Sequence, residues 1–176
     1  YIEEGEIWFE TTLPQWADEN GEPKQSVIDD PDKPVRADGK TDLAQLDSKQ
    51  IRDIRWRDIA IIPQSAMNAL NPVYKVGDQI VEAILRHEPE TTADEAHDRA
   101  RDLLERVGIE PDRADDYAHQ FSGGMKQRAV IAMAMACGPD LLIADEPTTA
   151  LDVIIQDRIL EELEALQEEF GVSILV

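Results

Sequence analysis

The sequence contains a single cysteine, Cys137, among its 176 residues. One thiol excludes an internal disulfide framework and any zinc centre that is built from several cysteines. Long apolar stretches are also lacking, because the longest, residues 129–137, falls far short of the roughly 20 apolar residues of a membrane-spanning helix. No signal-peptide pattern opens the chain. We therefore expect an intracellular protein that does not cross a membrane.

Basic side chains are the second shortage. The chain has 17 lysines and arginines against 38 aspartates and glutamates, for a formal net charge of −21 and an isoelectric point near 4.3. This balance argues against a nucleic-acid-binding protein, because such proteins need basic surface to neutralise phosphates. Hydrophobic residues still make up 42% of the chain, which is enough to bury a core.

The acidic residues are spread along the whole sequence. Residues 10–45 carry a net charge of −5, which leaves −16 for the rest of the chain. A surface that is acidic everywhere repels itself at low ionic strength and keeps the protein soluble. We interpret the excess as adaptation to a salty cytoplasm, with an ordinary acidic mesophilic protein as the alternative.

Apolar patterns predict both strands and helices. Short apolar runs predict strands near residues 6–9, 59–62, 141–144 and 172–176. Helical spacing and cap residues predict helices over residues 76–86, 92–107 and 122–137, a short one from the cap Ser48 through Arg55, and one that Asp152 caps. Because strand, helix and strand succeed one another in the last third of the chain, we expect a parallel sheet.

Residues 10–45 interrupt this pattern. They contain four prolines, several aspartates and little periodicity. Loops of this length inside a domain are uncommon and are usually functional or mobile. We predict a long, mobile excursion on the surface.

The segment Ser122-Gly-Gly-Met-Lys-Gln-Arg128 opens the helix predicted over residues 122–137. Two glycines in a first turn weaken a helix by roughly 1 kcal/mol each relative to alanine. Lys126 and Arg128 also place positive charge near the positive end of the helix dipole. A bound anion would resolve both conflicts, because glycines let backbone N–H groups approach a phosphate and Ser122 adds a hydroxyl. A glycine-rich helix start beneath a neighbouring loop is the structural alternative.

Two carboxylates, Asp145 and Glu146, follow the apolar strand predicted at residues 141–144. Ligands of open α/β sheets bind at this carboxyl end of the strands. Adjacent strand residues point to opposite faces, so one acid can hold Mg²⁺ while the other orients or deprotonates an attacking water. The alternative is a pair of solvent-facing acids, which the Pro-Thr-Thr-Ala-Leu-Asp segment at residues 147–152 makes a poor explanation.

Together these segments resemble the nucleotide-binding subunit of ATP-binding cassette (ABC) transporters. FSGGMKQR is similar to the signature motif of that family, LLIADEP to its Walker B strand, TALD to its D-loop and Ile62-Pro-Gln64 to its Q-loop. The order and spacing of the motifs are specific, whereas Ser-Gly-Gly alone would be weak. Residues 67–73 and 76–79 resemble the dipeptide and oligopeptide importer branch, from which Ala118 departs where proline is more usual.

The resemblance implies an α/β fold, in which a P-loop NTPase (ABC ATPase) core sheet carries an inserted α-helical subdomain and is incomplete at both ends. Residues 1–64 would be part of the core, with the acidic insertion at residues 10–45. Residues 65–137 would form the helical signature subdomain. Residues 138–176 would supply the Walker B strand, the D-loop, a helix and the following strand of the core.

The resemblance also implies roles in binding ATP. Ser122, Gly123 and Gly124, together with Gln127, would contact the ATP that the opposite subunit holds, the first three at its γ-phosphate. Asp152 would link the two nucleotide sites. The implied assembly is therefore a pair of ATPase subunits, as a homodimer or a heterodimer.

The resemblance further implies that residues of the Walker B and Q-loop segments carry out ATP hydrolysis. Asp145 would serve Mg²⁺, Glu146 would be the general base, and Gln64 would contact Mg²⁺ or the attacking water and sense the membrane subunit. ATP and Mg²⁺ are thus the expected cofactors.

The implied function is that of an ATP-hydrolysing subunit that powers peptide uptake through an ABC transporter. Such a subunit lies at the cytoplasmic face of the membrane, has membrane permease subunits as partners, and contacts neither cargo nor nucleic acid. Two alternatives stay open. One is a truncated, non-catalytic ABC-type assembly module, and the other is a soluble ABC-type ATPase outside transport.

Two elements of such an ATPase have no convincing counterpart. Gly39-Lys40-Thr41 matches the end of the phosphate-binding pattern G-x-x-x-x-G-K-[ST], but Pro34 replaces its first glycine, and we interpret the match as chance. The family's catalytic histidine would be expected just downstream of Val176. The simplest interpretation is the interior of a longer subunit, so we expect the isolated chain to hydrolyse ATP negligibly.

The three histidines have modest expected roles. His119 is open between a packed or hydrogen-bonded structural residue and a ligand. We expect His87 and His97 on solvated helix faces and the tryptophans in packing.

Overall fold

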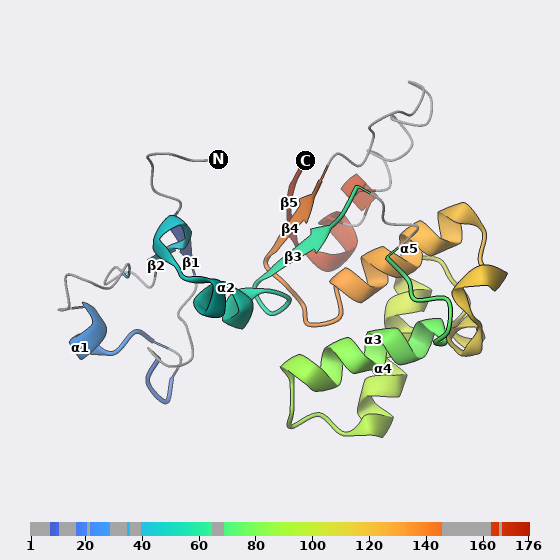
Figure 1. Cartoon of the computed structure of the whole chain (residues 1–176), viewed down its shortest axis with the longest axis horizontal. Helices are drawn as coiled ribbons and strands as arrows, with labels where there is room; N and C mark the ends of the chain where they lie inside the picture. Colours follow the sequence, from blue (N-terminus) through green and yellow to red (C-terminus); the bar gives the residue numbers. More distant parts are fainter. Residues whose placement is uncertain are drawn as a thin grey trace. The chain divides into compact units, whose positions relative to one another are not determined.

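A computed structural model describes most of the chain. The described residues are 8–10, 17–20, 22–28, 35, 40–64, 69–145, 163–165 and 167–176. They fall in two compact units, residues 1–55 and residues 56–176, which we describe separately (Figure 1). Glu146, Asp152 and much of the predicted excursion at residues 10–45 lie outside the described residues.

The first unit is built on one antiparallel pair of strands. β1 (Trp8–Glu10) pairs with β2 (Lys40–Asp42), with Trp8 opposite Asp42. The other elements among the described residues of this unit are α1 (Gln25–Ile28), the 3-10 turn η1 (Leu43–Gln45) and α2 (Ser48–Ile54). Thr41 and Asp42 are fully buried, so β2 lies inside this unit.

Asp47, and not Ser48, caps α2. The Asp47 carboxylate accepts hydrogen bonds from the N–H groups of Lys49 (2.7 Å) and Gln50 (2.8 Å), and Gln50 Oε1 accepts one from the Asp47 N–H (2.8 Å). These backbone donors hold the pKa of Asp47 below its usual value. The prediction of Ser48 as the cap is wrong because the reciprocal Asp47–Gln50 pair satisfies N–H groups on both sides of the helix start.

Three parallel strands form the sheet of the second unit, in the order β3 (Ile59–Ile62), β4 (Leu141–Ala144) and β5 (Ser173–Leu175). The predicted parallel sheet is confirmed. Ile62 lies opposite Ala144, so β3 and β4 end at the same edge. Among the described residues β3 and β5 pair on one side only, and Ile61 and Leu175 are exposed.

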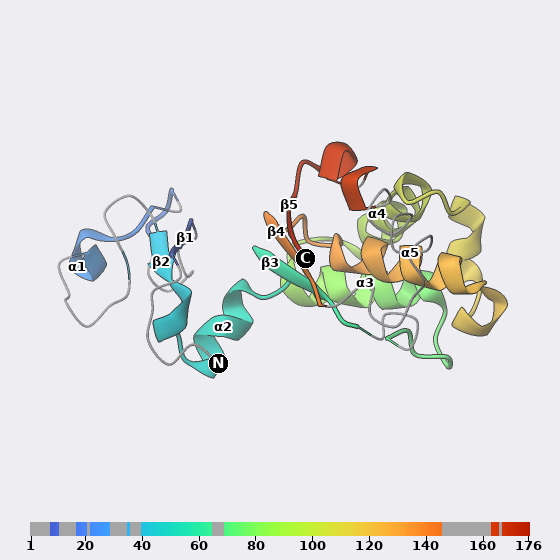
Figure 2. The same cartoon turned by 90° about the horizontal axis from the view of Figure 1, so that it is seen from above.

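Among the described residues between β3 and β4 are the helices α3 (Val76–His87), α4 (Ala93–Arg106) and α5 (Gly123–Ala134). The 3-10 turns η3 (Pro111–Asp115) and η4 (Ala118–Gln120) connect α4 to α5. α3 packs against α4 and α5, and α5 also packs against β3. In both views α5 begins away from the sheet and runs toward it (Figures 1 and 2). No helix in the described part of the chain is long and apolar enough to cross a membrane.

One apolar cluster joins these helices to the sheet. Its fully buried side chains include Ile80 and Ile84 of α3, Leu104 of α4 and Leu142 of β4. Burying a side chain of this kind contributes roughly 1.5–3 kcal/mol, so this cluster is the main source of stability of the unit. α3 also approaches η3 closely, since a Cβ added at Gly77 would lie 2.8 Å from the Ala114 carbonyl oxygen.

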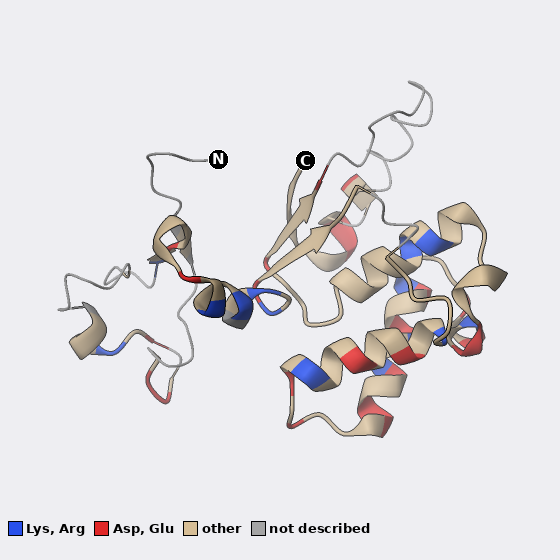
Figure 3. Ribbon diagram, in the orientation of Figure 1, with Lys and Arg blue, Asp and Glu red and all other residues tan. Residues whose placement is uncertain are grey.

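Acidic and basic residues are interleaved on α3 and α4 (Figure 3). Arg99 Nη1 lies 2.7 Å from Glu88 Oε2, and Lys75 Nζ lies 2.8 Å from Asp115 Oδ1. The second pair raises the pKa of Lys75 and lowers the pKa of Asp115. Because both of its members are exposed, this pair contributes little to stability.

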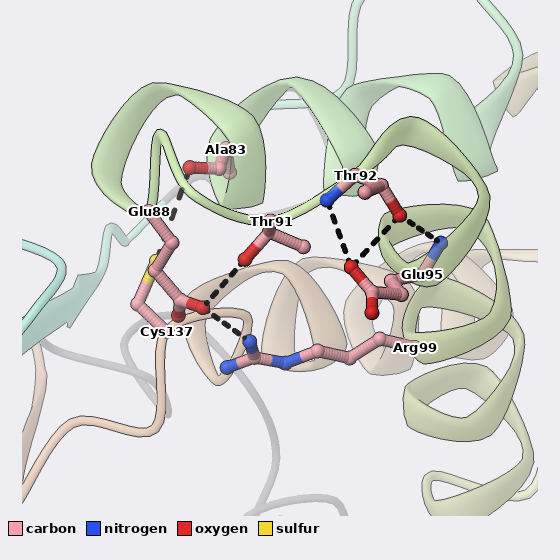
Figure 4. Close-up of polar contacts among 7 residues, drawn as sticks. All are labelled: Ala83, Glu88, Thr91, Thr92, Glu95, Arg99 and Cys137. Carbon is pink, nitrogen blue, oxygen red and sulfur yellow. Dashed lines mark hydrogen bonds and ion pairs between the residues drawn. The ribbon is translucent and has the colours of Figure 1, made fainter.

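α4 begins at the predicted capping box. Thr92 Oγ1 accepts a hydrogen bond from the Glu95 N–H (3.3 Å), and Glu95 Oε2 accepts from the Thr92 N–H (2.9 Å) and from Thr92 Oγ1 (2.8 Å) (Figure 4). Gly108 follows the end of α4 with φ +72°, the left-handed conformation that favours glycine. The predicted start and end of this helix are confirmed.

The remaining helices agree with the sequence in part. α5 starts as predicted but ends at Ala134 rather than at Cys137, because the chain turns there toward Gly138 and β4. Residues 163–165 and 167–170 are helical, and Gly171 (φ +67°) ends this segment before β5, as predicted. The predicted cap of that helix at Asp152 lies outside the described residues.

Candidate functional site

Ser122 and the two glycines after it form an exposed turn at the start of α5, which we call the signature turn (residues 122–124). Ser122 is the N-cap: its Oγ accepts a hydrogen bond from the Met125 N–H (3.3 Å), and its carbonyl accepts one from the Lys126 N–H (2.9 Å). Gln127 is half-buried in the next turn. The structure thus brings the four predicted signature residues together at one helix end.

The segment that leads into the signature turn is held in place. Arg113 forms an ion pair with Asp116, donates from Nη2 to the Gln120 carbonyl (3.1 Å), and lies 5.3 Å from the centre of the Phe121 ring. Phe121 is buried directly before Ser122. Sequence reasoning assigns no role to Arg113, and its spacing of three residues from Asp116 is the only sequence signal for this contact.

Gly124 is not required by the fold. A Cβ added there would meet no atom within 4 Å, and the backbone is not in the left-handed region. Alanine at this position would favour the helix by about 1 kcal/mol. The N–H groups of a first turn also have no partner within their own helix. The signature turn therefore exposes backbone N–H groups to solvent, and its glycine makes α5 less stable than alanine would.

Arg128 finds its partner within the chain. Its Nη1 donates to the carbonyl oxygens of Val107 (3.3 Å) and Gly108 (3.0 Å), just beyond the end of α4. The carboxyl end of a helix dipole is negative and stabilises a cation. The prediction that an anion explains Arg128 is therefore wrong. For Lys126 it stays a prediction, and no residue in the described ranges pairs with that ammonium group.

Gln64 and Asp145 follow the ends of two neighbouring strands. Gln64 comes two residues after β3 and Asp145 directly after β4, and the Asp145 N–H donates to the Ile62 carbonyl (2.9 Å). Both residues are exposed at the carboxyl edge of the sheet. A carboxylate and an amide oxygen suit Mg²⁺, which keeps most of its waters and takes few protein ligands. Within the described residues there is no group of three acidic, histidine or cysteine side chains that could hold a metal alone.

The candidate residues thus form two groups. Ser122, Gly123, Gly124 and Gln127 lie at the start of α5, whereas Gln64 and Asp145 lie at the sheet edge. The start of α5 and the carboxyl edge of the sheet lie apart in both views (Figures 1 and 2). Glu146 and Asp152 lie outside the described residues.

The match to a phosphate-binding loop at residues 39–41 falls in a strand. Lys40 and Thr41 belong to β2, and Thr41 is fully buried inside the first unit. In the phosphate-binding motif the same residues open a helix, where the lysine and the hydroxyl reach phosphate and metal. The interpretation of this match as chance is confirmed.

The histidines are ring-stacked or line a groove. His119 is exposed and stacks on Tyr117, with 5.6 Å between ring centres. His87 is half-buried and stacks on Trp56 (6.2 Å), and burial lowers the pKa of His87. The expected solvated position of His87 is therefore wrong, because the turn before β3 covers it. His97, also expected on a solvated face, is likewise half-buried, in a groove between α3 and α4.

Cys137 is not a reactive thiol in this fold. Burial raises its pKa to about 11, and its Sγ points at the Ala83 carbonyl (3.9 Å). Glu88 lies nearby and accepts hydrogen bonds from Thr91 Oγ1 (3.3 Å) and Arg99 Nη1 (2.7 Å), which fixes the α3–α4 connection (Figure 4). A thiol that stays protonated near neutral pH is a poor nucleophile and a poor metal ligand.

Comparisons with known proteins agree on the family. The family model described as ABC transporter matches residues 28–149, more than half of the chain. A Brucella melitensis protein named as a peptide import ATP-binding protein is 53% identical over 137 residues, covering 76% of this chain and 40% of that protein. The dipeptide transport ATP-binding protein DppD of Bacillus subtilis is 51% identical over 138 residues, covering 77% of this chain and 41% of DppD.

The fold is also that of solved ATP-binding cassettes. A dimeric cassette in a post-hydrolysis state, bound to ADP and Pi, has a TM-score of 0.59 and 28% identity, covering 80% of this chain and 59% of that one. The chain spans about 40% of the length of the curated relatives that it matches. With the signature turn and the sheet edge described above, these matches show that the chain belongs to the ABC transporter family of ATP-binding proteins.

Proposed function

We propose that this chain is part of a subunit that binds and hydrolyses ATP to power an importer, and that peptides are the cargo. The names of the relatives support the assignment: the two described above are named for peptide import and dipeptide transport. The subunit itself does not contact cargo in this proposal, so the peptide class rests on the relatives alone.

The observation that carries the proposal is the unexplained glycine at position 124. The fold leaves open space where its Cβ would be, and the helix would be more stable with alanine. Glycine is needed where a ligand must come closer to the backbone than a side chain allows. A phosphate at the positive end of α5 meets this condition and also accounts for Lys126 beside it.

In this proposal Ser122, Gly123, Gly124 and Gln127 bind the ATP held by an opposite subunit, the first three at its γ-phosphate. The distance between the start of α5 and the sheet edge supports action across a pair of subunits, because a triphosphate held at the edge of one copy is reached more readily by the turn of another. The pair is a homodimer or a heterodimer, and Asp152 links its two nucleotide sites.

Mg²⁺ would be held by Asp145 and Gln64, whose oxygens fit a hard cation that keeps water ligands. The metal supplies charge neutralisation at the phosphates when it is bound. Glu146 accepts the proton of the attacking water as general base, and Gln64 also senses the membrane subunit.

The proposed setting is the cytoplasmic face of the membrane, with permease subunits as the membrane partners and no nucleic acid bound. The proposed domain division is a core part at residues 1–64, a helical signature subdomain at residues 65–137 and a second core part at residues 138–176. The compact units divide instead at residue 55, so the core part would span both.

We also propose that the acidic surface is an adaptation to high salt. The net charge of −21 supports this proposal, because screening weakens repulsion between like charges. The urea concentration at half-unfolding should rise markedly between dilute buffer and molar potassium chloride. Equal midpoints in the two conditions would contradict the adaptation without touching the ATPase assignment.

The proposed function is tested with the product of the whole reading frame that contains this sequence, assayed for Mg²⁺-dependent ATP hydrolysis. Glu146→Gln should lower turnover by about 100- to 1,000-fold, because a general base is lost. Ser122→Ala should lower it by at least about tenfold, because one donor to the phosphate is lost. Ser48→Ala, at an exposed serine that also begins a helix, is the matched control and should leave turnover unchanged.

A mixture of the two defective variants shows whether the site is shared. In a mixed homodimer, the signature turn of the Glu146→Gln copy and the carboxylates of the Ser122→Ala copy make one intact site. Mixing should therefore restore a substantial part of the lost turnover. If turnover is restored neither by the mixture nor by an excess of either variant, these residues do not act across a homodimer.

A further inference from the structure

The carboxyl end of α4 is bonded on two sides. On one side, Arg128 of α5 donates to the Val107 and Gly108 carbonyls at 3.3 and 3.0 Å. Gly108 is constrained twice, because its φ is +72° and because a Cβ there would lie 2.9 Å from Arg128 Nη1. Any side chain at this position would displace the arginine. α5 is thus fixed to the end of α4 through a contact that requires both residues.

On the other side, the end of α4 contacts Glu169 and Phe170, which precede β5. Arg106, the last residue of α4, places Nε 3.0 Å from Glu169 Oε1 and donates from Nη2 to the Glu169 carbonyl (2.9 Å). Its guanidinium carbon also lies 3.8 Å from the centre of the Phe170 ring. One side chain therefore makes an ion pair, a hydrogen bond to backbone and a cation–π contact, a combination that lysine cannot reproduce.

These contacts form a continuous link from the signature turn to the sheet. α5 carries the signature turn at its start and Arg128 in its second turn. Arg106 joins the end of α4 to helical residues 167–170, which lead through Gly171 into β5, the neighbour of β4. Helices move as rigid bodies, so a displacement at Glu169 would be passed to the turn through the two arginines.

We propose that Arg106 is a positioning residue that couples the signature turn to the segment ending at Phe170, with Arg128 as the second joint of the same link. Arg106 touches no reacting group. It sets the orientation in which the turn meets its nucleotide, and this role rests on the proposed function of the turn.

The test is a charge reversal across the pair. In the ATPase assay, Arg106→Glu should lower kcat roughly tenfold and change KM for ATP less, because the turn is misplaced while the ATP site at the sheet edge is intact. The double variant Arg106→Glu with Glu169→Arg should recover most of the loss, since the ion pair is restored. Glu168→Arg, on the exposed residue next to Glu169, is the matched control for charge and should leave kcat unchanged.

Hydrogen exchange on the same whole-reading-frame product, measured without ATP, tests the coupling directly. The Met125 and Lys126 N–H groups, which are bonded to Ser122, should exchange faster in Arg106→Glu and return toward the wild-type rate in the double variant. Unchanged exchange at these two amides would overturn the coupling. Coupled exchange in a whole-reading-frame product that hydrolyses no ATP would sink the proposed function and leave the link standing.

Arg106→Lys is a milder variant for the case in which the charge reversal in Arg106→Glu prevents the protein from folding. It keeps the charge but loses the second donor to Glu169, so it should show the same two effects to a smaller degree. Wild-type exchange and wild-type kcat in this variant would count against the proposal, because the geometry of the guanidinium would then be irrelevant.

Discussion

α4 and α5 begin in opposite ways, although the same chain builds both within about thirty residues. α4 has a reciprocal capping box in which Thr92 and Glu95 satisfy each other's N–H groups, and Asp94 adds a further negative charge in its first turn. Among the described residues, α5 has a single side-chain cap, the bond to Ser122 Oγ, together with two glycines and no acidic residue in its first turn.

The difference separates stability from function. A complete helix start needs nothing outside the chain, and α4 shows that this fold can make one. The start of α5 lacks the negative charge that its dipole favours and leaves N–H groups exposed. An open helix start that is held in place by Phe121 and Arg113 supports our proposal that it binds a ligand.

Among changes at these two helix starts, Gly124→Ala should have the largest effect and should change activity and stability in opposite directions. The added methyl group keeps a phosphate away from the N–H groups, so ATP turnover should fall by about a hundredfold. The free energy of unfolding should rise by up to about 1 kcal/mol, because alanine favours the helix. ATPase assays and urea denaturation measure the two effects.

The matched control is Ala93→Gly, which places glycine in the first turn of α4. It should lower the free energy of unfolding by up to about 1 kcal/mol and leave turnover unchanged. If Gly124→Ala kept full turnover, the start of α5 would be a poor helix start and nothing more.

Thr92→Ala should have the next largest effect, and on stability alone. Loss of the cap leaves the Glu95 N–H without its partner, so the free energy of unfolding should fall by about 1 kcal/mol. Thr92→Ser keeps the hydroxyl and should lose much less. Equal losses in the two variants would mean that the hydroxyl does not stabilise the start of α4.

The smallest effect is a pH dependence confined to α4. The Thr92 N–H and hydroxyl lower the pKa of Glu95 from its ordinary value of 4.5. The stabilisation is therefore complete above that value and is lost as the pH falls through the lower, folded-state pKa. Glu95→Gln keeps the reciprocal box without a titrating group, so its urea midpoint should fall less than that of the wild type between pH 6 and pH 3.

Other carboxylates with lowered pKa values do not disturb the comparison of the wild type with Glu95→Gln. Asp47 and Asp115 also have lowered pKa values. Both residues are present in the wild type and in Glu95→Gln, so their contributions to the pH dependence cancel when the two proteins are compared. Parallel pH profiles for the wild type and Glu95→Gln would show that the carboxylate charge does not matter at this helix start.

Local patterns predict most elements of the second unit. β3 and β4 coincide with two four-residue apolar runs. A strand in a sheet that is covered on both faces consists of consecutive apolar residues, so such a run predicts it directly. The helix start at Ser122 follows from its side chain and the glycines after it. The signature residues and Gln64 are expected from the resemblance of their motifs to the family, Asp145 also from its place after an apolar strand, and the structure adds that strand register brings Gln64 and Asp145 to one edge.

What the sequence does not predict depends on partners far along the chain. Arg128 looks unfavourable near a helix start until the Val107 and Gly108 carbonyls, about twenty residues earlier, are placed beside it. His87 looks solvated until Trp56 stacks on it. At α2 the failure is local, since Asp47 and Ser48 are both good caps and only the reciprocal bond from Gln50 decides between them.

The sheet of the second unit has a practical consequence for anyone who produces this chain alone. Among the described residues β3 and β5 each pair with another strand on one side only, and Ile61, Leu175 and Val176 are exposed apolar side chains on these two strands and at the residue after β5. Such borders recruit further strands, from other copies if nothing else is available. Inclusion bodies and filament-like assemblies are thus the expected losses during expression, and a short extended peptide that docks along either border should act as a solubilising additive.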